Sequence, residues 1–279
     1  MSFMCDQLDI SRAGYYQWLQ AGRSIRQQWR QELKAQIQQV YLEHAGRYGA
    51  PRIAEELNDL GMACNRKTVA KLMRQQRIRA VMAKRFIPQT TDSNHEFPPA
   101  ENLLNQDFAA DRPNTRWVAD ITYVPTCEGW LYLAAVKDLC TRKIVGWSMA
   151  DHMRAELACE ALRDAIRREC PGPELIHHSD QGVQYACEQY QQTLLRNGII
   201  CSMSRRGNCY DNASMESFWS TYKQELVYPE KFQRKSEEEV KQATFKYIEL
   251  YYNRRRRHSA LGYKSPEQYH QSLTSGQAA

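Results

Sequence analysis

The sequence has no hydrophobic stretch long enough to cross a membrane. Its longest fully apolar run covers residues 130–136, whereas a membrane-spanning helix needs about 20 apolar residues. The first residues, MSFMCDQLDI, have neither a basic start nor a long apolar core, which argues against a secretory signal. We therefore expect a cytoplasmic protein that has no membrane partner.

The cysteines lack the close pairs that structural zinc sites usually need. There are nine of them, an odd number, and no two are arranged as CxxC. We therefore expect reduced, mostly buried thiols, to which the sequence assigns no function.

The last two thirds of the chain lack any excess of positive charge. Residues 91–279 carry 23 Lys and Arg against 25 Asp and Glu, whereas residues 1–90 carry 15 against 7. The net charge of +6 is thus concentrated in the first part, which predicts a basic module attached to a near-neutral one. Polyanions such as nucleic acids are natural partners of a basic module, although an ordinary solvated surface has the same composition.

Residues 1–87 are predicted to form this basic module, from helices alone. Two short helices are expected over 5–20, with Ser11 as a cap, and a longer one over 24–44. Residues 47–80 are predicted to fold as helix, turn and helix, with Gly61 in the turn.

The two helices predicted within residues 47–80 have the pattern of a DNA-binding helix-turn-helix. The first has the apolar stripe Ile53, Leu57 and Leu60, and the second has Asn65 as its cap. The second helix has an apolar inner side, and its outer side is basic, a pattern that helical hairpins without a role in DNA binding also have. Its basic residues are Arg66, Lys67, Lys71 and Arg74.

Residues 88–113 are polar and contain several prolines, so we predict a linker there, followed by a domain over 114–272 and a tail over 273–279. The segment RWVADITYVPT has apolar residues on both faces, as expected for a buried central strand. The order of elements after it predicts an α/β layer fold. The expected elements are strands at 116–126, 130–139 and 143–150, helix 155–170, strand 174–180, helix 187–197, strand 199–204 and helix 208–226.

Three carboxylates in this domain are candidates for one site. Asp120 lies in the middle of the central strand, where an unpaired charge is costly. Asp180 ends another strand, the usual position of functional groups in open α/β sheets. Glu216 lies in the helix that follows the last strand. Each acid taken singly has a structural explanation, so the hypothesis depends on all three together.

The three acids of the helix predicted over residues 208–226 differ in their angular positions around the helix axis. Its apolar stripe recurs at helical spacing, and Glu216 borders that stripe, with Lys223 on the same side. Glu225 is about 180° from Glu216 on an ideal helix, so we expect it to be solvated, and we expect Asp211 to cap the helix. The stripe consists of Met215, Phe218, Trp219, Tyr222 and Leu226.

The three acids also match a known family. Asp120, Asp180 and Glu216 have 59 and 35 residues between them, which reproduces the D, D(35)E signature of retroviral-integrase-like transposases. The segments WVADITYVPT, HHSDQGVQY, SRRGNCYDNASMESFWSTYKQEL and YYNRRRRHSALGYKSPEQY resemble, in order, the second-frame product (OrfB) of bacterial insertion-sequence transposases. RYGAPRIAEELNDLGMACNRKTVAKLMR resembles the helix-turn-helix-like segment before the core of these proteins.

The resemblance implies an RNase H-like catalytic core, a five-stranded mixed sheet flanked by helices, over residues 114–272. It also implies that Asp120, Asp180 and Glu216 hold Mg²⁺ or Mn²⁺, expected as two ions, to cut DNA at an element end. The freed 3′-hydroxyl then attacks another phosphodiester without a covalent protein–DNA intermediate. The expected partners are element-end and target DNA, and the expected location is the bacterial cytoplasm, at the nucleoid when DNA is bound.

Transposases of this group are frameshift fusions with an upstream reading frame that supplies a terminal-repeat-binding helix-turn-helix and a leucine zipper. From the resemblance we expect this chain to start inside such a fusion, at CDQLDISRAGYYQW, and its sequence has no sustained heptads. We therefore expect it to act with the upstream-frame product or fusion partner, as a homo-oligomer on DNA.

Further residues near these motifs are candidates for DNA contacts. Lys223 matches a basic residue of the group seven positions after the glutamate. Asn212 and Ser179 flank the site and are candidates for orienting ligands or phosphates, although capping explains Asn212 equally well. We expect one of His177 and His178 to face the core and the other the site.

A run of arginines near the end of the chain has two interpretations. Arg254 and Arg257 belong to RRRRH, which either holds the DNA backbone or is simply solvated. We expect the large aromatic residues of the domain to be core residues rather than base-stacking platforms. These are Trp117, Tyr123, Trp130, Trp147 and Phe218.

Three other functions are compatible with parts of the sequence. A non-catalytic DNA-binding regulator of the element has no use for a buried acidic cluster. A nuclease of the same fold that only hydrolyses DNA has the same acids. A tyrosine recombinase is excluded, since those enzymes use an HxxR pair and Leu261 stands three residues after His258.

Overall fold

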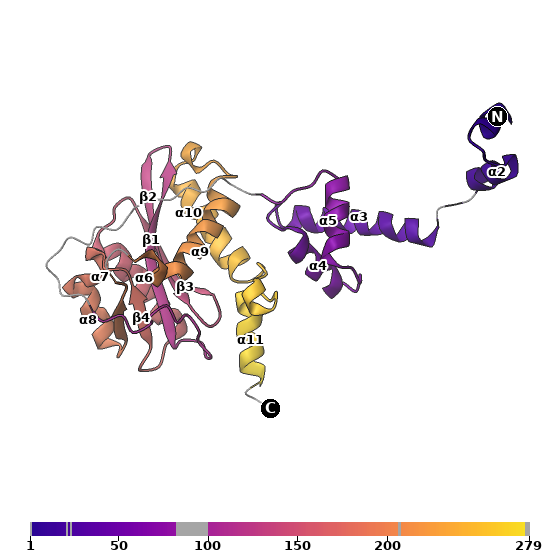
Figure 1. Ribbon diagram of the computed structural model, residues 1–279. Helices are drawn as coiled ribbons and strands as arrows, with labels where there is room; N and C mark the ends of the chain where they lie inside the picture. The colour runs from indigo at the N-terminus through magenta and orange to yellow at the C-terminus, as the bar shows by residue number, and fades with distance from the viewer. Residues whose placement is uncertain (1, 21, 23, 82–99, 206–207, 277–279) are drawn as a thin grey trace. The chain divides into compact units, whose positions relative to one another are not determined.

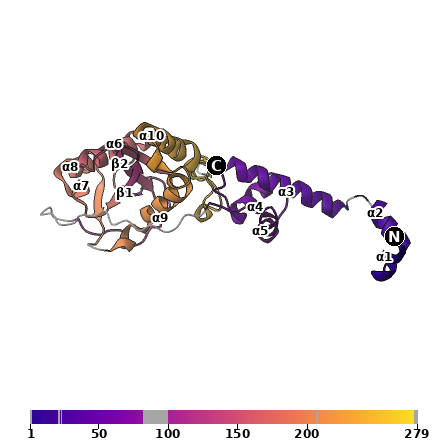
Figure 2. The same ribbon diagram turned by 90° about the horizontal axis from the view of Figure 1, so that it is seen from above.

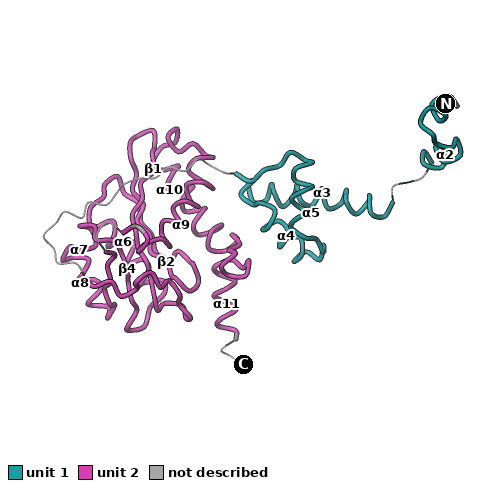
Figure 3. The backbone as a smooth tube through the Cα atoms, in the orientation of Figure 1, with its two compact units in different colours: residues 1–81 teal, residues 82–279 magenta. Residues whose placement is uncertain are grey.

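The computed structural model describes residues 2–20, 22, 24–81, 100–205 and 208–276. The chain divides into two compact units, residues 1–81 and 82–279 (Figure 3). No helix among the described residues is long and apolar enough to span a membrane.

Unit 1 consists of helices, and polar side chains cap the first turns of three of them. Ser11 Oγ accepts from the Gly14 N–H at 2.9 Å, and Ser24 forms a capping box with Gln27 at the start of the long third helix. Asn65 accepts from the Thr68 N–H. The helices are α1 (Ser2–Gln7), α2 (Arg12–Gln20), α3 (Ile25–Glu43), α4 (Ala50–Asp59) and α5 (Arg66–Gln75).

Helices α3, α4 and α5 share one small core, and the turn between α4 and α5 contains Gly61 at φ +81°. The basic residues predicted for α5 are exposed. The assignment of Leu60 to the apolar stripe is wrong, because α4 ends at Asp59 and the Leu60 side chain is 63% exposed. The core residues are Leu33, Ile37, Val40, Ile53, Leu57, Val69, Leu72 and Met73.

Unit 2 is built on a five-stranded mixed sheet in the order β3-β2-β1-β4-β5. The first three strands are antiparallel, and β4 and β5 run parallel to β1, which confirms the predicted architecture. The strands are β1 (Arg116–Thr126), β2 (Gly129–Asp138), β3 (Ile144–Ala150), β4 (Ile176–Ser179) and β5 (Ile200–Met203).

Helices cover both faces of this sheet, and α6 and α9 lie on opposite sides of β1 and β2 (Figure 2). Helix α6 approaches β3 closely at Gly146, where an added Cβ would lie 2.3 Å from the Ala161 carbonyl oxygen, so only glycine fits there. The helices are α6 (Ala155–Glu169), α7 (Val183–Ala186), α8 (Glu188–Arg196), η1 (Cys209–Asn212), α9 (Ala213–Tyr222), η2 (Lys223–Val227), η3 (Phe232–Arg234), α10 (Glu237–Phe245), η4 (Lys246–Tyr252), η5 (Ser259–Leu261) and α11 (Pro266–Gly276).

The alternation of β1 decides which residues face which layer. Trp117, Ala119 and Ile121 belong to the core beneath α6 and α8. Asp120 therefore points to the opposite face, where it meets Trp219 of α9. On that face α9 and η4 are joined by ring contacts, such as Phe218 with Tyr252 at 4.9 Å between centroids.

The segment before β1 packs on unit 2. Leu104 is 2% exposed, and the Leu103 N–H donates to Ser202 Oγ of β5 at 2.9 Å. Asn102 and Gln106 each donate to the Asp211 carboxylate at 2.9 Å. Residues 88–99 of the predicted linker lie outside the described residues, and the domain boundaries remain predictions.

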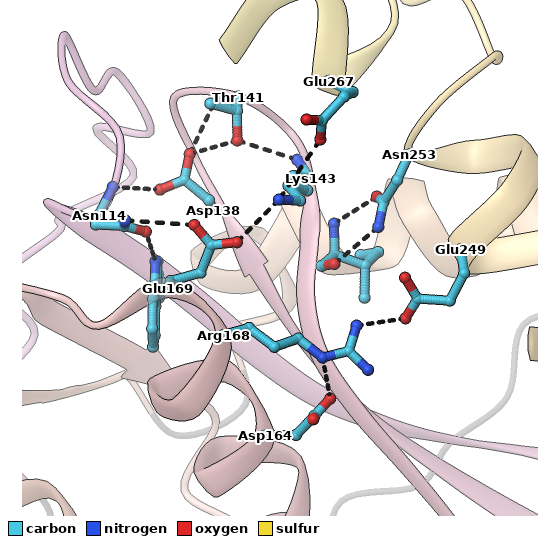
Figure 4. A network of polar contacts seen from close by, with 12 residues as sticks. Asn114, Asp138, Thr141, Lys143, Asp164, Arg168, Glu169, Glu249, Asn253 and Glu267 are labelled. Carbon is cyan, nitrogen blue, oxygen red and sulfur yellow. Dashed lines mark hydrogen bonds and ion pairs between the residues drawn. The ribbon is translucent and has the colours of Figure 1, made fainter. Parts of the chain in front are cut away.

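A polar network fastens the C-terminal helices to the sheet (Figure 4). Asn253 donates to the Ile144 carbonyl oxygen and accepts from the Ile144 N–H, both at 2.9 Å. Lys143 pairs with Glu169 at 2.9 Å, and Arg168 pairs with Glu249. A cavity of about 530 Å³ lies beside these groups.

Lys137 of β2 is a buried lysine on the α9 side of the sheet. It is 5% exposed, and its Nζ donates to the Ser214 carbonyl oxygen at 3.0 Å. Burial, followed by the positive charges of Arg142 and Arg256, lowers the pKa of Lys137 from 10.5 to about 7. The unfolded chain therefore binds more protons than the folded chain between these two values, so the free energy of unfolding rises with pH across that window.

Replacement of Lys137 with methionine should remove this pH dependence. Between pH 7 and 9.5 we expect the free energy of unfolding of the unsubstituted protein to rise by about 1–3 kcal/mol more than that of Lys137→Met. Urea unfolding at both pH values measures the difference. Lys246→Met, at an exposed lysine, is the control and should keep the pH dependence. The same dependence in Lys137→Met would mean that Lys137 titrates normally.

Candidate functional site

Asp120 lies on β1, just beyond the point where the pairing of β1 with β4 ends. The ladder between β1 and β4 ends at the pair Val118–His178, two residues before Asp120. Asp120 Oδ1 accepts from the Ile121 N–H at 2.8 Å, and Oδ2 accepts from the Trp219 indole N–H at 2.9 Å. Burial, then the charge of Asp180, and to a smaller degree that of Glu216, raise the pKa of Asp120 to about 8.

Asp180 directly follows β4, as predicted, and is held by the turn that leads into α7. Its Oδ1 accepts from the Gly182 N–H at 2.9 Å. A Cβ on residue 182 would lie 3.0 Å from Asp180 Oδ1 and 2.9 Å from Gln184 Oε1. The glycine therefore lets the backbone N–H approach the carboxylate, which orients Asp180.

Glu216 lies in the first turn of α9, and its side chain is exposed. Partial burial raises the pKa of Glu216. Two side chains that flank it in the sequence tie α9 to β1. Asn212 Nδ2 donates to the Ala119 carbonyl oxygen at 3.2 Å, and Trp219 donates to Asp120. The start of α9 is therefore fixed against the strand segment that carries Asp120.

The predicted apolar stripe is confirmed as buried across α9 and η2, and it explains why Glu216 stays outside the core. All five stripe residues are at most 6% exposed. Besides burial, the charges of Asp180 and Glu216 both raise the pKa of Asp120. Among the described residues, however, no three His, Cys, Asp or Glu side chains are gathered closely enough to hold a metal ion.

Asp211 does not cap α9, so that prediction is wrong. Its carboxylate is fully buried and receives an ion pair from Arg205 at 2.8 Å as well as the donors of Asn102 and Gln106. The hydrogen bond from the Arg205 side chain is the main cause that holds the pKa of Asp211 well below its usual range. Asp211 therefore links the segment before β1 to the segment that precedes α9.

Glu225 is not solvated, which corrects a second prediction. It is 8% exposed, and both its oxygens accept from Arg256, while Oε2 also accepts from Tyr247 Oη at 2.9 Å. The helix widens to a π-helix over Lys223–Val227. The wider turn has i→i+5 hydrogen bonds, so positions after Tyr222 no longer follow the ideal 100° step.

Lys223 is also buried, at 7% exposed. Its Nζ lies 5.3 Å from the centroid of the Tyr123 ring, a cation–π contact. Burial lowers the pKa of Lys223, and the charge of Asp120 opposes that effect. The ammonium group is thus held beside β1, close to the acid set.

The arginines of the RRRRH run differ in burial. Arg254 is exposed, whereas Arg256 is 5% exposed and paired with Glu225 at 2.8 Å. Arg257 is partly buried and donates to the Tyr263 carbonyl oxygen at 3.1 Å. Arg256 is therefore a core residue.

The two histidines of β4 both lie inside the domain, so the expectation that one faces the site is wrong. His177 Nε2 lies 3.0 Å from Tyr190 Oη, and His178 lies 2.8 Å from Ser202 Oγ and 3.1 Å from Ser204 Oγ. Burial lowers the pKa of His177 to about 3 and is the main cause that lowers that of His178 to about 4. Both rings are neutral at pH 7.

Three other expectations can be compared with the structure. Ser179 Oγ donates to the Asp180 carbonyl oxygen at 3.0 Å. Trp130 is 53% exposed, so its assignment to the core is wrong. The described cysteines are free thiols, and Cys127 and Cys170 among them are exposed.

Comparison with known proteins identifies the family. A family model described as an integrase core domain matches residues 110–209, a second of that description matches 197–266, and an HTH-like domain matches 28–86. The chain is 45% identical over 272 residues to the insertion element IS600 uncharacterized 31 kDa protein of Shigella sonnei, covering 96% of this chain and 99% of that protein. It is also 45% identical over 268 residues to the transposase InsF for insertion sequence IS3A of Escherichia coli K12, covering 95% and 92%.

The chain belongs to the IS3-type insertion-sequence transposases. Membership in this transposase family confirms the predicted resemblance and the combination of an integrase core with a helix-turn-helix-like region. It also confirms the predicted function class, DNA transposition.

The solved structures similar to this transposase are distant. The HTLV-2 integrase catalytic core domain in complex with magnesium is 16% identical, with a TM-score of 0.45, and the match covers 58% of this chain and 99% of that one. A chain of the simian T-cell lymphotropic virus intasome in complex with the PP2A regulatory subunit B56 gamma is 14% identical, with a TM-score of 0.48, covering 80% and 70%. The family assignment rests on the sequence relatives.

Proposed function

We propose that this transposase cuts DNA at the ends of its insertion element and joins the freed 3′-hydroxyl to a new phosphodiester, using Asp120, Asp180 and Glu216. The observation that carries the proposal is the attachment of α9 to β1. Asn212 binds the carbonyl of Ala119, and Trp219 binds the carboxylate of Asp120. This double attachment supports a shared site, because Glu216 lies between the two contacts in the sequence.

The chemistry of the three side chains fits a divalent cation. All three offer carboxylate oxygens, the ligands that Mg²⁺ and Mn²⁺ prefer. Burial, followed by the charges of Asp180 and Glu216, disfavours ionisation of Asp120, and a bound cation would offset the repulsion between these charges. We infer that Asp120, Asp180 and Glu216 hold two ions, which when bound activate the attacking hydroxyl and stabilise the leaving oxygen.

The other residues of the site would hold and orient these groups during the reaction. The 3′-oxygen forms a bond to phosphorus while the P–O3′ bond of the target strand breaks, which leaves a 3′-hydroxyl on the target. Trp219 and Gly182 fix the orientations of Asp120 and Asp180 through their N–H groups. Lys223 would add positive charge toward a DNA phosphate from its position beside Tyr123.

DNA contacts are also proposed for both units. In unit 1 the basic side of α5 is exposed and is suited to phosphate contacts through Arg66, Lys67, Lys71 and Arg74. In unit 2 the candidates are Arg254, which is exposed, and Arg257, which is partly buried. Element ends, target DNA, the upstream-frame product and further copies of the chain are the proposed partners.

A joining assay with two forms of the same DNA end tests the reaction. We expect the full chain, supplied with the upstream-frame product, Mg²⁺ and an element-end oligonucleotide, to join ends that carry a 3′-hydroxyl. Ends that carry a 3′-dideoxy terminus should not be joined, since they lack the nucleophile, and EDTA should stop both cleavage and joining. DNA binding without any cleavage would favour the regulator, and cleavage without joining of 3′-hydroxyl ends would favour a nuclease.

A further inference from the structure

Tyr185 is attached to the turn that orients Asp180. The Gly182 N–H donates to Asp180 Oδ1, and the Gly182 carbonyl oxygen accepts from the Tyr185 N–H, each at 2.9 Å. Gln191 Nε2 donates to the Tyr185 carbonyl oxygen at 2.7 Å. The backbone of Tyr185 is thus held firmly relative to the Asp180 side chain.

The side chain of Tyr185 is buried, but its hydroxyl makes no hydrogen bond with the described residues. The residue is 2% exposed, and its ring packs edge-to-face on Tyr190 with 5.2 Å between centroids. Among the described residues, Tyr185 Oη has no hydrogen-bond partner. A buried hydroxyl without a partner destabilises a fold, so a phenylalanine would suit the packing better.

The neighbouring Tyr190 has the hydrogen-bond partner that a buried tyrosine hydroxyl usually has. Tyr190 Oη, which is equally buried, has His177 Nε2 as its partner at 3.0 Å. Burial, followed by Tyr190 and then by the charges of Asp120 and Asp180, raises the pKa of Tyr185 well above its ordinary value. The Tyr185 hydroxyl therefore stays protonated. It is a hydrogen-bond donor near the carboxylates of Asp120 and Asp180, and it has no acceptor among the described residues.

We propose that Tyr185 is a positioning residue of the catalytic site, whose hydroxyl donates to the Asp180 carboxylate once a divalent cation draws Asp180 and Asp120 together. Asp180 is the proposed acceptor because Tyr185 is attached to the same turn that orients the Asp180 side chain. The bond would hold Asp180 in the cation-bound orientation. This inference rests on the proposed function, because it requires these acids to be cation ligands.

Thermal unfolding of the full chain without divalent cations gives the first test. Tyr185→Phe should raise the melting temperature by roughly 2–4 °C, since it removes an unpartnered buried hydroxyl. The matched control Tyr190→Phe should lower it, since it takes away the partner of His177. A lower melting temperature for Tyr185→Phe would overturn the inference, because the hydroxyl would then already have a partner.

Addition of Mn²⁺ gives the second test. The rise in melting temperature that Mn²⁺ causes should be smaller in Tyr185→Phe than in the unsubstituted protein or Tyr190→Phe, and the strand-transfer rate of Tyr185→Phe should fall about 10-fold. An unchanged Mn²⁺ response and rate in Tyr185→Phe would overturn this inference alone. Absence of any Mn²⁺ response in the unsubstituted protein would instead contradict the proposed function, and this inference with it.

Discussion

Asp120→Asn should reduce DNA cleavage and strand transfer by at least about 10³-fold, which corresponds to roughly 4 kcal/mol of lost transition-state stabilisation. Asparagine keeps the size of the side chain and one acceptor oxygen, but it removes the negative charge that a cation requires. Glu216→Gln should have an effect of the same order. The assay with 3′-hydroxyl element ends measures both rates.

The same substitution separates catalysis from folding. Burial and the charge of Asp180 disfavour the ionised form of Asp120, so the loss of that charge should leave the free energy of unfolding without cations within about 1 kcal/mol of that of the unsubstituted protein. Glu238→Gln, at an exposed glutamate of α10, is the carboxylate control and should keep full activity. Activity near the unsubstituted level in Asp120→Asn or Glu216→Gln would refute the assignment of the acids.

Arg256→Ala should lower the free energy of unfolding by about 3–5 kcal/mol, because it leaves the buried carboxylate of Glu225 without its cation. The pair is enclosed on both sides, with 5% and 8% of the two residues exposed. Arg254→Ala, two residues away and exposed, should change stability by no more than about 0.5 kcal/mol. Chemical denaturation of both variants compares the two arginines directly.

The double variant Arg256→Met with Glu225→Leu tests whether the pair itself is needed. Replacement of both charges with apolar groups of similar size should recover most of the stability lost in Arg256→Ala. A loss in Arg256→Ala no greater than that in Arg254→Ala would contradict the buried pair. It would mean that Arg256 is solvated, which is one of the two interpretations that the sequence leaves open for the run.

Local patterns in the sequence were sufficient for the strands of unit 2 and for its main helices up to residue 226, whereas the helices α10, η4 and α11 after that point were not predicted. The apolar run RWVADITYVPT coincides with β1, Arg116–Thr126. The spacing of Met215, Phe218 and Trp219 correctly left Glu216 at the border of the core. These properties depend on neighbours within a few residues, which is the range over which periodicity carries information.

The errors arise where a distant partner or an irregular turn decides the outcome. Glu225 is buried because Arg256, 31 residues away, donates hydrogen bonds to its carboxylate, and because Glu225 lies in the π-helix Lys223–Val227. Asp211 is buried because residues before β1 reach it. No local pattern shows that Trp219 donates to Asp120, or that the Tyr185 hydroxyl has no hydrogen-bond partner among the described residues, since both depend on the packing of separate elements.

The double hydrogen bond between Asn253 and Ile144 has a consequence for self-association. Ile144 belongs to β3, the outermost strand on its side of the sheet, and such a strand is a template on which another chain can add a strand. The amide of Asn253 imitates the backbone of a neighbouring strand by engaging both the N–H and the C=O of Ile144. The C-terminal helical segment thus closes one position of this edge and makes intermolecular strand pairing there less favourable.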